Sequence, residues 1–153
     1  MKIGFHNSIE EISKNEWNSL LNDINYPFLK HDFLQLLENT NCVGAKTGWI
    51  PLHITVSKDN SLLAAMPLYL KSHSQGEFVF DHSWANAFYQ HGLDYYPKLV
   101  SSIPHTPASG PRFLIKEGEN KKELFEMIKK GVKSIAAKNN ISSWHILFPM
   151  EEE

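Results

Sequence analysis

The sequence predicts a single α/β domain with a mixed, mostly antiparallel sheet flanked by helices. Segments with apolar residues at helical spacing alternate with segments rich in β-branched and aromatic residues, in the order α-α-β-β-α-β-α-β. The chain has 153 residues, 42% of them hydrophobic, which is enough for one core. Because no internal repeat or low-complexity run divides it, we expect one domain over residues 1–153.

The first forty residues are expected to contain a short strand and two helices. Residues 2–6 are predicted to form the strand. Two Ser-x-x-Glu sequences begin at Ser8 and Ser13, and such capping boxes satisfy free amides at the start of a helix. The second box is expected to start a helix that ends before Pro27, and another helix is expected near residues 30–39. The first helix is predicted to bury Trp17, Leu20, Leu21 and Ile24.

The middle of the chain is predicted to form a β-hairpin. Residues 49–56 and 62–70 are rich in residues that favour strands, and residues 58–61 supply a turn. Pro67 has no backbone N–H to donate to a ladder, so we expect an edge, a bulge or a strand interruption there.

The next segment is predicted to contain a strand, a helix and a second strand. The strands are expected at residues 78–80 and 95–103, and the helix at residues 84–90. Asp81 or Ser83 is positioned to cap this helix, and capping alone is the alternative to a role for Asp81 in a site. Three prolines rigidify the following loop, residues 103–112, which suits either a cleft wall or a stable connection. A helix at 123–138 and a strand at 143–148 complete the chain.

Composition narrows the classes of function. The formal charge is -2, from 15 basic and 17 acidic residues, which provides no global field for nucleic acid or an anionic membrane. A single cysteine, Cys42, excludes an intramolecular disulfide and fits a reducing compartment. The sequence has neither a secretion signal nor an apolar run as long as a membrane span, so we expect a soluble, cytoplasmic protein.

Polar residues, most of them titratable, are concentrated around Gly76, between apolar runs. They are Lys71, His73, Ser74, Glu77 and Asp81. Buried titratable groups cost several kcal/mol unless they find partners, so this concentration indicates a site. The alternative is a solvated turn after a strand.

Several ordered motifs carry a family resemblance. They lie at residues 27–29, 48–53, 66–81, 95–99 and 104–112. In these motifs the chain resembles the FemAB-like family of N-acyltransferases, described as peptidoglycan biosynthesis/recognition, in the GNAT acetyltransferase superfamily. The resemblance implies a GNAT-like fold. It departs at His105, where an apolar or aromatic residue is expected. Family members resemble two GNAT-like halves in tandem, which implies that this chain is the first half, either truncated or a natural half-protein.

The resemblance implies acyl or aminoacyl transfer to an amine. That reaction requires a base for the amine proton and donors for the developing oxyanion. His73 and Glu77 are the candidate bases. The candidate substrate-binding residues are Lys71, Ser74, Asp81, Trp84, Tyr95, Tyr96, Lys98 and Arg112. Among these, Lys71, Lys98 and Arg112 are candidate clamps for carboxylate or phosphate, and the tyrosines are candidates to donate a proton or line a pocket.

The acyl donor and the partners are left open. Acetyl-CoA or another acyl-CoA would need a glycine turn of the Gln/Arg-x-x-Gly-x-Gly/Ala type at a helix start, and the sequence has none. Relatives imply aminoacyl-tRNA as another donor, although the net charge favours no broad RNA surface. The expected partners are a small-molecule or peptide amine and the missing C-terminal half or a second copy.

Three hypotheses follow. The chain is the acceptor-side half of an N-acyltransferase, inactive or weakly active alone, or a non-enzymatic binding module for a cell-wall precursor or small peptide. The third is a metal site, for which the candidate ligands match no compact motif. These ligands are His73, Glu77, Asp81, His82 and His91.

Overall fold

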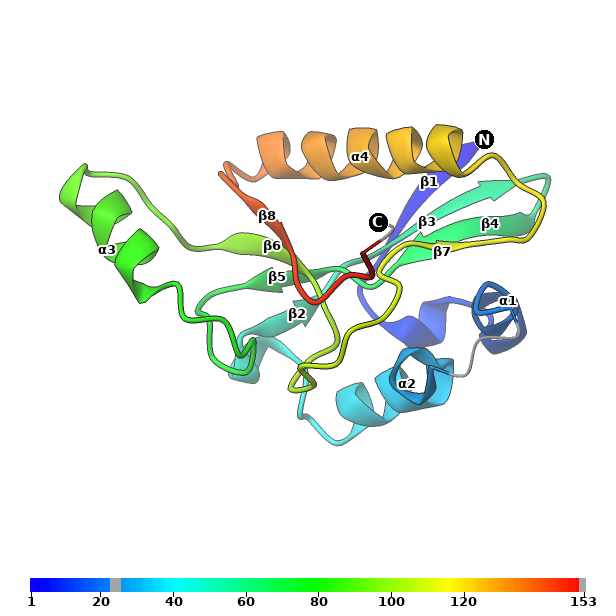
Figure 1. Cartoon of the computed structure of the whole chain (residues 1–153), viewed down its shortest axis with the longest axis horizontal. Helices are drawn as coiled ribbons and strands as arrows, with labels where there is room; N and C mark the ends of the chain where they lie inside the picture. The colour runs from blue at the N-terminus through cyan, green and yellow to red at the C-terminus, as the bar shows by residue number, and fades with distance from the viewer. Residues whose placement is uncertain (23–25, 152–153) are drawn as a thin grey trace.

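The computed structural model describes residues 1–22 and 26–151 and shows a mixed α/β fold in layers (Figure 1). Helix α4 (Lys121–Lys138) covers one side of the strands, and α1 (Lys14–Ser19) and α2 (His31–Asn39) lie on the other. Helix α3 (His82–Gln90) projects from one end. The predicted α/β class is confirmed, and Ile24 lies outside the described residues. Short 3-10 helices are η1 (Ile9–Glu11), η2 (Pro27–Leu29) and η3 (Ala45–Thr47).

Within the described residues, the strands form two four-stranded sheets. The first has the order β1-β3-β4-β7 and is antiparallel throughout. The second has the order β2-β5-β6-β8, in which only β8 runs parallel to its neighbour β6. The strands are β1 (Lys2–His6), β2 (Trp49–Pro51), β3 (His53–Lys58), β4 (Ser61–Met66), β5 (Tyr69–Lys71), β6 (Lys98–Ser101), β7 (Leu114–Ile115) and β8 (Trp144–Ile146).

The predicted hairpin links the two sheets. Its arms pair as β3 and β4 in the first sheet and continue as β2 and β5 in the second. The strand interruption predicted at Pro67 is present, and there Leu52 N–H donates to the Leu68 carbonyl at 2.8 Å. The hairpin turn places Asp59 and Asn60 at φ 49° and 62°, a conformation that these two residue types tolerate better than most.

Three details differ from the sequence-based expectation. The strand predicted at residues 78–80 is wrong: this segment is irregular, and Phe78 has a φ of 59° that no strand residue adopts. Strand β7, which was not predicted, has two residues, too few to produce an alternating pattern. At the start of α1, Ser13 caps Glu16 N–H as predicted, but the Glu16 carboxylate accepts from Leu62 N–H instead of returning to the cap.

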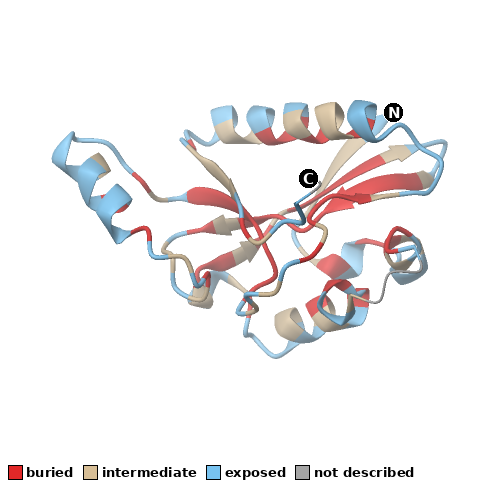
Figure 2. Ribbon diagram, in the orientation of Figure 1, coloured by how far each residue is buried: buried red, intermediate tan, exposed pale blue. Residues whose placement is uncertain are grey.

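Apolar side chains fill the space on both sides of the first sheet. One cluster joins Ile54 and Val56 of β3 to α4, and a second lies beneath Leu62 and Ala65 of β4, around Trp17. Figure 2 shows that many of the buried residues lie in the strands, whereas α3 is largely exposed. Among the described residues, no helix has both the length and the apolar character needed to cross a bilayer.

Gly131 sets the approach of α4 to the first sheet. A Cβ added there would lie 2.7 Å from Ile54 Cδ1 and 3.0 Å from Ile3 Cγ2. We expect Gly131→Leu to destabilise the fold by about 1–3 kcal/mol through overpacking. Urea unfolding measures the loss. Ser134→Leu, on the exposed face of the same helix, is the control, and equal stability of the two variants would contradict this packing.

Candidate functional site

A buried ion cluster lies between β5, β6 and the start of α3. The Lys98 ammonium contacts Glu77 Oε2 at 2.8 Å, Asp81 Oδ2 at 2.5 Å and Ser74 Oγ at 3.0 Å. The exposed fractions of Lys98, Glu77 and Asp81 are 0%, 1% and 4%. An ammonium has three N–H donors, so these contacts use its full capacity and offset the cost of burying the charge.

Two tyrosines complete this arrangement. Tyr95 OH donates to Asp81 Oδ2 at 2.7 Å, and Tyr96 OH shares a hydrogen bond of 2.6 Å with Ser74 Oγ. We call Lys98 and the five side chains around it, Ser74, Glu77, Asp81, Tyr95 and Tyr96, the Lys98 cluster. The sequence-based site residues that the structure brings together here come from two separate segments, residues 74–81 and 95–98.

Local backbone structure positions these groups. Lys98 begins β6, directly opposite Lys71 of β5. Between β5 and α3, the chain turns at Gly76, which has a φ of 78°, so Glu77 can point back to the strands. Asp81 occupies the cap position of α3 but makes no side-chain capping bond. The capping alternative for Asp81 is therefore wrong: its carboxylate turns to Lys98 and Tyr95, which both bind Oδ2.

Burial and hydrogen bonding shift the pKa values of the two carboxylates in opposite directions. Desolvation raises the pKa of Glu77, against the opposing effect of the Lys98 and Lys71 charges. Desolvation also acts upward on Asp81, but hydrogen bonds led by the one from Lys98 outweigh it and lower the pKa to about 2. Asp81 therefore stays anionic over the whole physiological range, whereas Glu77 is the carboxylate closer to exchanging a proton.

Lys71 is the second buried cation of the site. Its Nζ lies 3.8 Å from the centroid of the Trp49 ring and donates to the Gln75 carbonyl at 3.1 Å. Desolvation lowers its pKa to about 8, and the Lys98 charge adds to this effect while Glu77 opposes it. Lys71 is thus a cation at pH 7, and it loses its proton as the pH rises through about 8.

Two buried carboxylate oxygens accept no hydrogen bond from the part of the chain that the structure describes. They are Glu77 Oε1 and Asp81 Oδ1, each on a carboxylate whose other oxygen binds Lys98. Buried polar atoms are nearly always satisfied in folded proteins. These two unsatisfied acceptors, on the carboxylates that bind Lys98, therefore favour a hydrogen-bond donor, N–H or O–H, supplied from outside the chain.

An aromatic pocket opens beside the Lys98 cluster. It has a volume of about 410 Å³, and its lining includes Phe80, Asp81, Trp84, Phe88, Tyr95 and His145. Phe80 and Trp84 are 89% and 66% exposed. Large exposed apolar side chains that gather on one surface are unusual unless they contact a ligand or a partner. Sequence reasoning included Trp84 but missed Phe80, Phe88 and His145. His145 reaches the pocket only because β8 pairs with β6, and no local signal reveals that pairing.

Other candidate residues lie outside the Lys98 cluster. His73 is half-buried beside Gly48, its Nδ1 accepts from Gln75 N–H at 3.2 Å, and burial lowers its pKa. Arg112 donates to the carbonyls of Leu147, Gly110 and Ala108 at 2.9, 3.0 and 2.6 Å. These contacts hold the proline loop against the chain after β8, while a role for Arg112 as an anion clamp stays a prediction.

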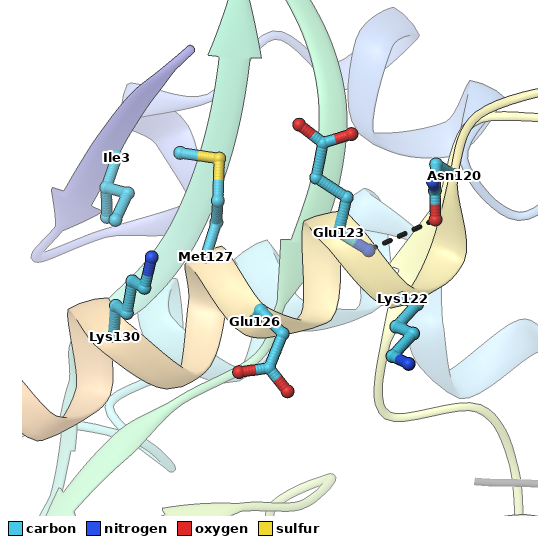
Figure 3. Close-up of a pocket in the computed structure, with 7 residues that line it drawn as sticks. All are labelled: Ile3, Asn120, Lys122, Glu123, Glu126, Met127 and Lys130. Carbon is cyan, nitrogen blue, oxygen red and sulfur yellow. Dashed lines mark hydrogen bonds between the residues drawn. The ribbon is translucent and has the colours of Figure 1, made fainter.

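A wider hollow lies on the opposite side of the molecule from α3, between β1 and the start of α4. Its volume is about 580 Å³. Figure 3 shows Lys122, Glu123, Glu126 and Lys130 around it, charges of both signs on an open surface. Asn120 Oδ1 accepts from Glu123 N–H at 3.2 Å, an ordinary helix cap. Within residues 1–22 and 26–151, no group of three or more His, Cys, Asp or Glu side chains is arranged to hold a metal ion.

The fold and the site define a mixed α/β domain with a buried lysine and two carboxylates at the edge of an aromatic pocket. The chain belongs to the FemAB-like family: the model of that family, described as peptidoglycan biosynthesis/recognition, matches residues 8–153. The resemblance seen in the sequence motifs is thereby confirmed, and the family description connects the chain to peptidoglycan. No curated protein and no solved structure matches the chain.

The structure predicts a large stability difference between two lysine substitutions. Lys98→Met leaves Glu77 and Asp81 buried without their cation, so we expect a loss of roughly 3–5 kcal/mol at pH 7. Lys129→Met is the control, because Lys129 pairs with Glu126 on the surface of α4, where the expected loss is at most about 1 kcal/mol. Equilibrium urea unfolding measures both. Similar losses in the two variants would show that the Lys98 ion pairs do not stabilise the fold.

Proposed function

We propose that this chain is the acceptor-side domain of an N-acyltransferase that modifies an amine on a cell-wall precursor. The observation that carries the proposal is Glu77: a buried carboxylate with a raised pKa, whose Oε1 accepts no hydrogen bond among the described residues. Membership of a family described as peptidoglycan biosynthesis/recognition supports the choice of substrate. A base with an elevated pKa and a free acceptor atom is what proton removal from an amine requires.

The reaction assigns separate roles to the charged groups. The amine nitrogen attacks the carbonyl carbon of an activated acyl ester or thioester, and Glu77 Oε1 takes a proton from that nitrogen. The C–O or C–S bond then breaks, and the leaving group departs with its electron pair and receives the proton from Glu77. Lys71, still protonated below pH of about 8, favours the negative charge that develops on the carbonyl oxygen.

Lys98 has a positioning role in this proposal. All three of its N–H donors are used by Ser74, Glu77 and Asp81, so none is available for substrate. Its contacts fix the orientation of Glu77, because one carboxylate oxygen is held and the other is left to act. The tyrosines hold Asp81 and Ser74 in turn.

This chain lacks the glycine turn that would bind the pyrophosphate of an acyl-CoA donor. The sequence contains no Gly-x-Gly or Gly-x-Ala run, and the anionic Asp81 occupies the cap position of α3, where a phosphate would need a positive field. These residues therefore do not fit coenzyme A. This disagreement supports an acceptor-side role, with the donor held elsewhere, and the tandem arrangement of two halves stays a prediction.

A second candidate function is a binding module for the same class of precursor without transfer. The rigid, fully bonded Lys98 and the permanently anionic Asp81 favour it, because recognition needs a fixed electrostatic pattern but no proton transfer. Two experiments separate the alternatives. An amine-bearing precursor peptide is incubated with aminoacyl-tRNA or acyl thioesters, and mass spectrometry detects acylated product. A precursor at a hundred times its Kd should also stabilise the protein by about 2.7 kcal/mol.

Both experiments use this chain and any longer form of the protein that contains it. Acylated product supports the transferase. Stabilisation by the precursor without product from any donor or protein form supports the binding module and contradicts the transferase.

Glu77→Gln tests the assigned base. We expect kcat to fall roughly 10²- to 10⁴-fold with little change in KM, because the amide cannot accept the proton. In the unsubstituted protein, activity should fall as the pH drops through the raised pKa of Glu77, where the carboxylate becomes protonated. Glu119→Gln, on an exposed turn, is the control. A loss in His73→Gln but not in Glu77→Gln would transfer the role of base to His73.

A further inference from the structure

The aromatic pocket has the chemistry of a cation site. Among the described residues of its lining, Asp81 is the one acidic or basic side chain besides His145, and burial lowers the pKa of His145, so this imidazole is neutral at pH 7. Asp81 is anionic there. The faces of Phe80, Trp84 and Phe88 add negative electrostatic potential, since aromatic rings carry a negative face. Lys98 pairs with Asp81 Oδ2 and offsets part of its charge, so the aromatic faces and the free Oδ1 of Asp81 supply the attraction for a cation.

Asp81 Oδ1 specifies the kind of cation. Its partner oxygen Oδ2 accepts from both Lys98 and Tyr95, whereas Oδ1 is buried and accepts nothing among the described residues. Satisfying Oδ1 requires an N–H or O–H donor. A quaternary ammonium has neither donor, and a neutral alcohol would gain no attraction to the aromatic faces and no charge-assisted hydrogen bond, so a primary ammonium fits best.

The walls specify what carries the ammonium. Apolar surface predominates in the pocket, and Phe80 and Trp84 are the two most exposed large apolar side chains of the described chain, at 89% and 66%. Because both belong to the exposed segment around the start of α3, their side chains are free to adjust as a ligand enters. An aliphatic stem would bury against these rings, while its ammonium reaches the carboxylate beneath them.

We propose that the aromatic pocket binds a primary ammonium on an aliphatic stem, with Asp81 Oδ1 accepting its N–H and Trp84, Phe80 and Phe88 enclosing the stem. This assignment deepens the proposed function and rests on it for its biological meaning: the bound ammonium would lose one proton to solvent to become the attacking amine, and Glu77 would take the second proton during acyl transfer. Binding itself requires no acyl donor, so it is tested separately from transfer.

The test is an NMR titration of the protein with 1-aminobutane at pH 7, where this amine is cationic. We expect saturable shifts at α3 and His145, with no saturable binding of 1-butanol or butyrate. Butyltrimethylammonium should bind at least about tenfold more weakly than 1-aminobutane, because it cannot donate to Oδ1. Equal binding of butanol, or of the quaternary amine, would overturn the proposal.

Variants of α3 localise the binding without disturbing the core. Trp84→Ala removes an exposed ring and should weaken the binding of 1-aminobutane roughly two- to fivefold. Tyr89→Ala is the matched control, because Tyr89 is an exposed aromatic of the same helix that is not part of the pocket lining. Equal effects of the two would contradict the assignment.

Two further outcomes show whether the proposed transferase or the pocket assignment is wrong. Binding of 1-aminobutane by a protein that never acylates any amine would overturn the transferase and leave the cation pocket in place. Self-association that depends on Trp84, with no binding of 1-aminobutane, would show that the aromatic walls bury against a second copy and would overturn the pocket assignment.

Discussion

The rest of the site depends on Lys98, whose buried ammonium has to be neutralised inside the protein. Desolvating a charge costs several kcal/mol, and here Glu77, Asp81 and Ser74 offset that cost. To reach Lys98, the turn after β5 must fold back and α3 must start beside β6. One electrostatic requirement therefore fixes the positions of both carboxylates and of the helix that forms the pocket wall.

The break in the long hairpin provides the platform for this cluster. Where β4 passes into β5, Leu68 N–H donates to His53 Nδ1 at 3.4 Å, while His53 Nε2 contacts Glu38 Oε1 at 3.1 Å. Glu38 also accepts from Ser8 Oγ and Ile9 N–H. The helical layer is thus bonded to the point at which the strands change sheets, and β5 leaves that point carrying Lys71 towards Lys98.

Much of this arrangement could be predicted from the sequence, and the exceptions have physical reasons. The periodic helices and the hairpin were predicted because their patterns are local. The polar residues around Gly76 were recognised as a group because titratable side chains among apolar runs are costly. His145 was missed because it joins through a parallel strand pair distant in sequence, and Phe80 because an apolar triplet was taken for a strand. The bonding of Asp81 depended on Lys98, 17 residues away, which a capping pattern cannot reveal.

The central claim is that the Lys98 cluster gives its two carboxylates opposite electrostatic characters. Carbon-13 NMR titration of the side-chain carboxyls measures this directly, with Asp81→Asn and Glu77→Gln spectra used to assign the signals. The account predicts a pKa of about 2 for Asp81 and a pKa above the ordinary value of 4.5 for Glu77. Ordinary values for both carboxyls, or the reverse order, would contradict the buried cluster and the roles assigned to its members.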